Sequence, residues 1–171
     1  MPRICADLNV WCAAILADAY GRRGTAAQTI VDVLRTGRSE RGAAALVISF
    51  GMLERLARVL VRDLDFAPAD AAALTGAIAG YAEQGPSLSP GGVGVMPIHD
   101  AEDRHVLETA WAGGADFLVT ADLRGFLQKD AEVSAPSRIL RLSRSGRSLI
   151  VAHPFTFAAW LRGKDQPGFG G

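Results

Sequence analysis

Short runs of apolar residues alternate along this chain with longer segments in which apolar residues recur at helical spacing. Runs that are apolar throughout are typical of strands in a sheet covered on both faces. Because helix-length segments separate them, each crossover would carry the chain back across the sheet and leave neighbouring strands parallel. The pattern predicts an α/β fold, a three-layer α/β/α sandwich with a central, mostly parallel sheet of about five strands. The candidate strands cover residues 3–6, 45–48, 93–98, 117–119, 139–142 and 149–151.

Helix start and stop signals support this interpretation. Thr25 can cap a helix that Gly37 would end, and Ser49 can cap the helix after the second strand. The later helices are expected over about 68–83, 101–112 and 154–161.

The chain has the size of one domain with a single hydrophobic core. Its 171 residues are 49% hydrophobic, and residues 85–92 resemble a surface loop more than a linker between domains. We expect one domain over 1–162 and a disordered tail over 163–171. Cys5 and Cys12 are expected to be free thiols. No apolar run reaches the roughly 18 residues of a membrane helix, which favours a soluble cytoplasmic protein.

Four acidic residues follow the candidate strands: Asp7, Glu54, Asp103 and Asp122. Functional residues of open α/β sheets lie beyond the carboxyl ends of the strands, so these carboxylates are expected to converge. Clustered carboxylates raise one another's pKa and need a cation to neutralise them. Hard oxygen ligands favour Mg²⁺ or Mn²⁺, which can polarise a phosphoryl oxygen and lower the pKa of a bound water. The pattern indicates metal-assisted hydrolysis of a phosphodiester.

Each acid also has a structural interpretation. Asp7 can cap the helix that follows it, and Glu54 can pair with Arg58 four residues later. Asp100 is the better candidate for an N-cap, with Asp103 three residues further on. The fourth acid can be a turn residue. The functional interpretation is favoured because an acid recurs after four successive strands.

Four segments of the chain carry a resemblance to a known family. They are Ala6-Asp7-Leu8-Asn9-Val10, Ser49 with Leu53–Leu60, Asp100–Asp103 with Val106-Leu107, and Gly114–Asp122. In these motifs the chain resembles the PIN-domain ribonucleases of the compact prokaryotic type, which includes the toxins of toxin and antitoxin pairs. The resemblance extends from about Arg3 to Leu161, and the segment that ends at Asp122 is its most specific part.

The resemblance implies an endoribonuclease that uses Mg²⁺ or Mn²⁺. The metal-binding acids of the family correspond to the four acids named above. Asp103 is preferred to Asp100 because of its spacing to Asp122, and Asp100 is then an outer ligand. Asn9 and Thr120 correspond to polar positions that can orient a carboxylate or a metal-bound water. RNA is the implied substrate, and an antitoxin protein and a second copy of the chain are the implied partners.

One residue departs from the family pattern. Ala121 stands where many members have Gly, Arg or another polar residue, which could alter substrate contacts without changing the metal ligands.

The overall charge gives no sign of a nucleic-acid partner, since Lys plus Arg and Asp plus Glu are 18 each. A local patch must therefore hold RNA, and Arg22, Arg23 and Arg124 are candidates because Arg pairs well with phosphate. A solvated loop is the alternative for the first two, and an ion pair is the alternative for Arg124. Four arginines at every third residue predict either a phosphate-facing stripe or ion pairs: Arg138, Arg141, Arg144 and Arg147. The tryptophans are expected in the core, so base stacking is not indicated.

Three other functions compete with a ribonuclease. Phosphotransfer enzymes also place an Asp after the first strand, but dehalogenase-type phosphatases need a second Asp where this chain has Asn9. Receivers need a Lys after a late strand, which neither Lys129 nor Lys164 supplies. A non-catalytic metal-binding or RNA-binding module with the same fold remains an alternative. DNA is the third, as in flap-type nucleases, whose inserted arches need a longer chain.

Overall fold

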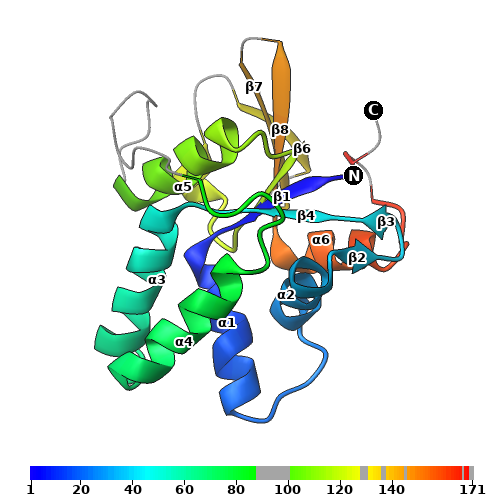
Figure 1. Ribbon diagram of the computed structural model, residues 1–171. Helices are drawn as coiled ribbons and strands as arrows, with labels where there is room; N and C mark the ends of the chain where they lie inside the picture. The colour runs from blue at the N-terminus through cyan, green and yellow to red at the C-terminus, as the bar shows by residue number, and fades with distance from the viewer. Residues whose placement is uncertain (88–100, 128–130, 136–137, 145, 167, 170–171) are drawn as a thin grey trace.

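In the described part of the chain, a six-stranded sheet forms the centre of the protein (Figure 1). The computed structural model describes residues 1–87, 101–127, 131–135, 138–144, 146–166 and 168–169. The sheet has the order β4-β1-β5-β8-β7-β6, in which the first four strands are parallel to one another and β7 is antiparallel to both of its neighbours, β8 and β6. The strands are β1 (Arg3–Ala6), β4 (Ala45–Val47), β5 (Phe117–Val119), β6 (Ala131–Ala135), β7 (Ile139–Arg144) and β8 (Arg147–Ala152). A separate small sheet pairs β2 (Arg38–Ser39) with β3 (Gly42–Ala43).

The predicted α/β fold with a mostly parallel sheet is confirmed. The sequence misses β6, because this strand contains Glu132 and Ser134 and is largely exposed at the edge of the sheet. It also misses the two-residue strands β2 and β3, which are too short to carry a pattern. The strand expected over 93–98 lies outside the described residues.

Helices cover both faces of the sheet. On one face, Val47 contacts the chain at Gly113, directly after α5. Val47 is in the same register as Leu118, whose neighbour Phe117 must point to the opposite face. There the ring of Phe117 packs against Phe157 of α6, with 5.2 Å between the ring centroids. The helices are α1 (Leu8–Ala19), α2 (Ala26–Thr36), α3 (Phe50–Arg62), α4 (Pro68–Ala79), α5 (Ala101–Ala112) and α6 (Pro154–Leu161), with a 3-10 turn η1 (Arg124–Phe126).

Side-chain caps begin two of these helices as predicted. Thr25 Oγ1 accepts a hydrogen bond from the Gln28 N–H, and Gln28 Oε1 accepts one from the Thr25 N–H, which completes a capping box. Ser49 Oγ accepts from the Met52 N–H at 3.2 Å. The same hydroxyl lies 3.0 Å from Thr109 Oγ1 in the buried interface with α5. Ser49 therefore both caps α3 and connects it to α5.

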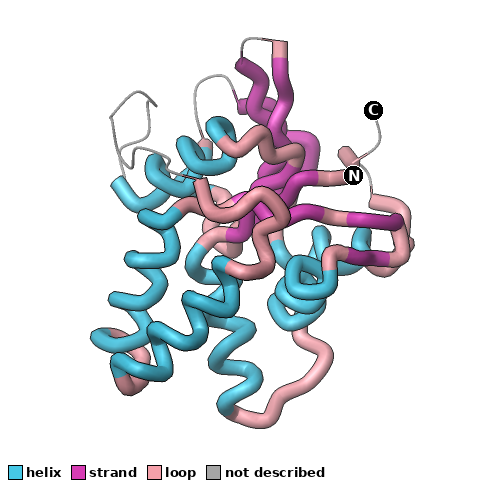
Figure 2. Tube along the Cα trace, viewed as in Figure 1, coloured by secondary structure: helices cyan, strands magenta, loops and turns pink. Residues whose placement is uncertain are grey.

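The segment after α6 lies beside the β2–β3 hairpin (Figure 2). Arg41 in this hairpin donates to the Trp160 and Lys164 carbonyls at 2.7 and 3.1 Å, and its guanidinium lies over the Trp160 ring. Phe169 stacks on Trp160 with 5.3 Å between the ring centroids. Part of segment 163–171, for which the sequence predicts disorder, therefore contacts the core in this structure.

Candidate active site

Asp7 lies where β1 ends and α1 begins. Its backbone N–H continues the sheet by donating to the Val119 carbonyl at 2.9 Å. Its carboxylate already belongs to the helix, because Oδ1 accepts from the Leu8 N–H at 2.6 Å. The capping role expected for Asp7 is confirmed. Since β1 and β5 are parallel, the residues after β5 reach the same edge of the sheet.

The second carboxylate oxygen of Asp7 lies within a polar cluster, called here the Asp7 network, that consists of Asp7, Asn9 and Thr120. Asp7 Oδ2 accepts from Asn9 Nδ2 and from Thr120 Oγ1, both at 2.7 Å. Asn9 Nδ2 also lies 3.1 Å from Thr120 Oγ1, and Asn9 Oδ1 accepts from the Ala121 N–H at 3.1 Å. The two polar positions predicted to orient a carboxylate are therefore both in contact with Asp7.

Burial sets the electrostatics of Asp7. The residue is 7% exposed, and this desolvation raises the pKa of its carboxyl group above the ordinary value of 3.8. The hydrogen bonds from Thr120, Leu8 and Asn9 lower the pKa, and the nearby charge of Asp122 raises it. The balance is a raised pKa, so the ionised form of Asp7 carries a free-energy cost that a cation would offset.

Asp122 follows β5 in a short loop that is connected to the Asp7 network. Its backbone N–H donates to Thr120 Oγ1 at 3.1 Å, and its Oδ1 accepts from the Arg124 N–H at 3.1 Å. Thr120 therefore donates to Asp7 and accepts from Asn9 and Asp122, which uses the full capacity of a hydroxyl group. The hydroxyl group of Thr120 thus connects the Asp7 carboxylate to the backbone N–H of Asp122.

Asp103, in the first turn of α5, reaches the same region from a different direction. It is half-buried, and its carboxylate lies so close to the Gly125 Cα that a side chain at position 125 would overlap Oδ2. Gly125 belongs to η1, three residues after Asp122. Asp103 is therefore placed beside the turn that follows the fourth acid, Asp122. Asp100 lies outside the described residues.

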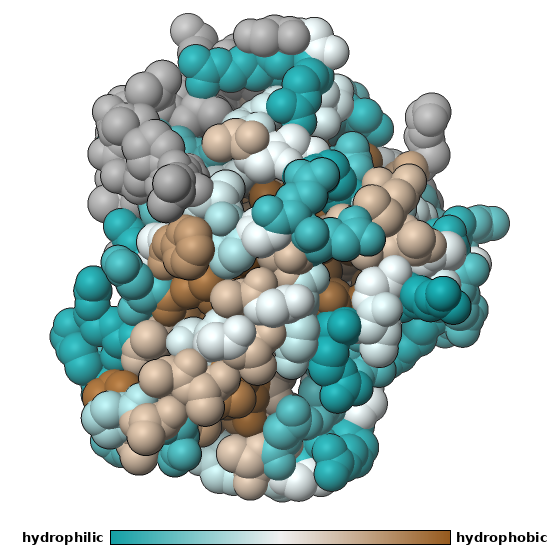
Figure 3. Space-filling view, in the orientation of Figure 1, coloured by the Kyte–Doolittle hydropathy of each residue, from teal (hydrophilic) through white to brown (hydrophobic). Residues whose placement is uncertain are grey.

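Glu54 is placed differently from the three aspartates. It is exposed on α3 and lines an apolar hollow between α3 and α4, together with Phe50 and Arg58. Figure 3 shows hydrophobic side chains gathered over these two helices. The face of α3 toward α5 carries Gly51, which lies against the ring of His105. Among the described residues, no three His, Cys, Asp or Glu side chains are close enough together to hold one metal ion.

A groove, called here the cationic groove, begins beside the Asp7 network. It is lined by Asn9 and Ala121 at one end and extends between α1, the loop before α2, and α6, with a volume of about 720 Å³. Arg22, the first of the predicted RNA-binding arginines, lines it. Its walls also contain residues that the sequence analysis did not single out: Tyr20, His153, Phe155, Arg162 and Lys164.

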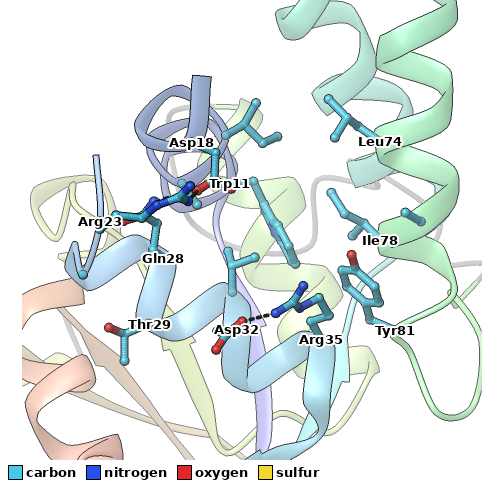
Figure 4. Close-up of a pocket in the computed structure, with 15 residues that line it drawn as sticks. Trp11, Asp18, Arg23, Gln28, Thr29, Asp32, Arg35, Leu74, Ile78 and Tyr81 are labelled. Carbon is cyan, nitrogen blue, oxygen red and sulfur yellow. Dashed lines mark hydrogen bonds and ion pairs between the residues drawn. The ribbon is translucent and has the colours of Figure 1, made fainter. Parts of the chain in front are cut away.

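A second hollow, called here the paired hollow, lies on the other side of α1, between α1, α2 and α4 (Figure 4). It has a volume of about 430 Å³. Arg23 lines it and forms an ion pair with Asp18 at 3.6 Å, so its charge is compensated. Arg35 and Asp32 form a second ion pair on its wall. The two adjacent arginines of the loop before α2 therefore line different hollows.

The arginines at every third position do not form one stripe. Arg144 and Arg147 are paired directly across the β7–β8 hairpin, whereas Arg141 lies three residues from Arg144 on the same strand. Residues an odd number apart on a strand point to opposite faces. The guanidinium of Arg147 lies over the Trp111 ring at 5.6 Å and donates to the Trp111 carbonyl. The phosphate-facing stripe considered from the sequence is therefore wrong.

A comparison with protein families identifies this arrangement. A sequence model described as PIN domain matches residues 3–124. The chain belongs to the PIN-domain family. Comparisons with curated proteins and with solved structures gave no match. PIN domains are generally nucleases that act on RNA with divalent metals, and in this one all four predicted acids lie within the matched residues. No described helix of this PIN domain is long and apolar enough to span a membrane.

Proposed function

We propose that this PIN-domain protein is a divalent-metal-dependent endoribonuclease in which Asp7, Glu54, Asp103 and Asp122 bind Mg²⁺ or Mn²⁺. The observation that carries the proposal is the Asp7 network. A carboxylate whose ionised form is penalised by burial, and whose two oxygens are held by fixed donors, is prepared for a cation before the cation arrives. Membership in the PIN-domain family supports the same reading.

The donor chemistry of the site fits a hard divalent cation. Asp7 Oδ2 accepts two hydrogen bonds and Oδ1 accepts one, so that one of the four lone-pair positions of the carboxylate is left on Oδ1. Asp103 and Asp122 offer further carboxylate oxygens, the ligands that Mg²⁺ and Mn²⁺ prefer. When bound, such an ion supplies polarisation of the phosphate and a water of lowered pKa.

The remaining residues have positioning roles in this proposal. Asn9 and Thr120 fix the orientation of the Asp7 carboxylate, and Thr120 also holds the loop of Asp122 through its backbone N–H. Gly125 leaves room for the Asp103 carboxylate. Asp100 is proposed as an outer ligand.

Metal-supported cleavage of a single-stranded RNA tests the proposal. Asp7→Asn and Asp103→Asn should each reduce Mn²⁺-dependent cleavage on the order of 10³-fold, whereas Asp70→Asn, on the exposed first turn of α4, should leave it unchanged. Full activity of either of the first two variants would refute the mechanism. Glu54→Gln should reduce cleavage less than the aspartate variants do. An unchanged rate for Glu54→Gln would remove Glu54 from the site and leave a site of aspartates.

One observation favours a second candidate function, a non-catalytic PIN-fold module that binds metal or RNA. Among the described residues, the acids do not come together in a set of three around one point. A module of this kind would bind Mn²⁺ and RNA in titration calorimetry without cleaving the RNA at any metal concentration. Cleavage that disappears in Asp7→Asn excludes it.

The toxin role and the homodimer are proposed from the family resemblance. Growth arrest on expression of the wild-type chain, relieved by Asp7→Asn, would support a toxin, and unimpaired growth with the wild-type chain would oppose it. Sedimentation at micromolar concentration tests the homodimer.

A further inference from the structure

The cationic groove contains positive charge without negative charge. Arg22, Arg162 and Lys164 are exposed on its walls, and no Asp or Glu lines it among the residues that the structure describes. Arg162 Nη2 donates to neutral acceptors, the Gly24 carbonyl and Thr29 Oγ1. A polyanion would therefore meet three cations in the groove, although the whole chain has a net charge of zero.

Several acidic side chains lie near the groove but do not line it. Asp18 pairs with Arg23 and accepts from Gln28, and Asp165 accepts from Arg41. The Glu40 carboxylate lies against Gly163, and the Asp7 carboxylate lies beside Asn9. These carboxylates border the groove, whereas the charged side chains that line it are all cationic and form no ion pair among the described residues.

Two aromatic rings are exposed on the same walls. Tyr20 is 74% exposed and Phe155 is 69% exposed, which is unusual for large rings in a chain of this composition. The Phe155 ring stacks on His153, with 5.4 Å between centroids and 19° between planes. His153 is itself fixed, because its Nδ1 accepts from the Phe155 N–H. The stack against His153 favours one orientation of the exposed Phe155 ring.

The groove is continuous with the candidate active site. Asn9 and Ala121 line its end, and Asn9 contacts Asp7 through Nδ2 and Ala121 through Oδ1. A strand with one phosphate at Asp7 would enter the groove without leaving the protein surface. Cationic walls combined with exposed rings are the features that bind single-stranded nucleic acid, because unpaired bases stack on the rings while the backbone follows the charge.

We propose that the cationic groove binds the single-stranded RNA segment next to the cleaved phosphodiester, with phosphates at Arg22, Arg162 and Lys164 and a base stacked on Phe155. This proposal rests on the proposed function, because it places the bound segment next to a phosphodiester cleaved at the Asp7 network. It adds a specific recognition surface, formed in part by α6 and its flanking residues, which lie outside residues 3–124 of the family match. Duplex RNA is disfavoured because its bases are not available for stacking on the ring.

Binding of a fluorescent single-stranded RNA to the full chain, followed by anisotropy in EDTA, tests the groove separately from catalysis. Phe155→Ala should weaken binding on the order of tenfold. Arg22→Gln combined with Lys164→Gln should lower the slope of log K against log salt by about 1.4, since each phosphate contact on a single strand contributes about 0.7. Arg35→Gln, in the paired hollow, is the matched control and should bind like wild type.

The outcomes separate the groove from the nuclease. Wild-type affinity in Phe155→Ala and in the double variant, with cleavage intact, would overturn the groove and leave the nuclease. Weakened binding in these variants without any cleavage by wild type would retain the groove and overturn the nuclease. Equal loss of affinity for duplex RNA would overturn single-strand recognition. A wild-type dimer that Phe155→Ala converts to monomers in sedimentation, with RNA affinity unchanged, would assign the groove to a second copy of the chain.

Discussion

Helix α1 separates two hollows with similar apolar walls, one with paired charges and the other lined by cations alone. Trp11, Ala14 and Ile15 face the paired hollow, whereas Val10, Ala13 and Leu16 face the cationic groove, so the helix is apolar on both sides. In the paired hollow each lining arginine has a carboxylate partner. In the cationic groove, none of the three cations forms an ion pair with a carboxylate among the described residues. A chain with no net charge can therefore still contain a site for a polyanion, because charge acts locally over about a Debye length.

The largest effect should come from the Asp7 network, and it should separate catalysis from RNA binding. Asp7→Asn should reduce metal-supported kcat on the order of 10³-fold, the scale seen when one electrostatic contact to the reacting group is removed. RNA affinity in EDTA should not weaken, because the groove is intact and a negative charge is gone. Single-turnover kinetics and anisotropy measure the two quantities. A parallel loss of both would mean that Asp7 maintains the groove instead.

A smaller effect is expected at Asn9, which donates a hydrogen bond to the Asp7 carboxylate. Asn9→Ala removes a donor to Asp7 and an acceptor for the Ala121 N–H. Groups that orient a metal ligand typically change affinity or activity by about 10- to 100-fold, so Mn²⁺ affinity should fall by that factor. Calorimetric titration with Mn²⁺ measures it. An unchanged Mn²⁺ affinity with a lowered melting temperature would indicate that Asn9 serves the fold alone.

The raised pKa of Asp7 predicts a pH effect on stability with a definite sign. In metal-free solution the folded protein binds the Asp7 proton more tightly than the unfolded chain does, so stability from this group is present below pH 3.8 and is lost as pH rises through the raised pKa. The Asp7→Asn variant has no carboxyl group at this position and therefore does not lose this stability as pH rises. The unfolding free energy of the variant minus that of wild type should therefore increase with pH across this window, as urea titrations at several pH values can measure. A flat difference would contradict the burial effect.

The smallest effects concern the helix that borders both hollows. Thr25→Ala removes the capping box of α2 and should cost about 1 kcal/mol of unfolding free energy. Asp32→Ala breaks an exposed ion pair in the paired hollow and should cost less than about 0.5 kcal/mol, with RNA affinity unchanged. Urea unfolding and anisotropy check both variants. Weaker RNA binding in Asp32→Ala would remove the distinction between the hollows.

The members of the Asp7 network could be predicted because the strand ends indicate Asp7 and the family resemblance adds Asn9 and Thr120. Asp7, Asn9 and Thr120 follow paired parallel strands, so the register of the sheet brings them into contact. Glu54 illustrates the limit of such a prediction. Glu54 lies one turn before Arg58 on α3. Leu53 and Leu56 are buried positions of this helix, and Glu54 and Arg58 both line the hollow between α3 and α4. The pairing with Arg58 considered from the sequence is not among the ion pairs of the described residues, and Glu54 remains a proposed ligand.

The cationic groove could not be predicted, for a different reason. Its cations come from positions 22, 162 and 164, which only the packing of α6 against α2 brings together. Phe155 lies in a helix that is apolar nearly all round, so the sequence does not separate its exposed ring from the buried ring of Phe157. Which face of a short apolar helix meets solvent is decided by tertiary contacts.

The acidic site depends on the absence of a side chain at Gly125. Its φ is not among the positive values that favour glycine, so the backbone there would accept other residues. The space would not, because a methyl group would occupy the position of the Asp103 carboxylate. A single added carbon at position 125 would thus displace the Asp103 carboxylate, although every acidic residue of the chain would remain in the sequence.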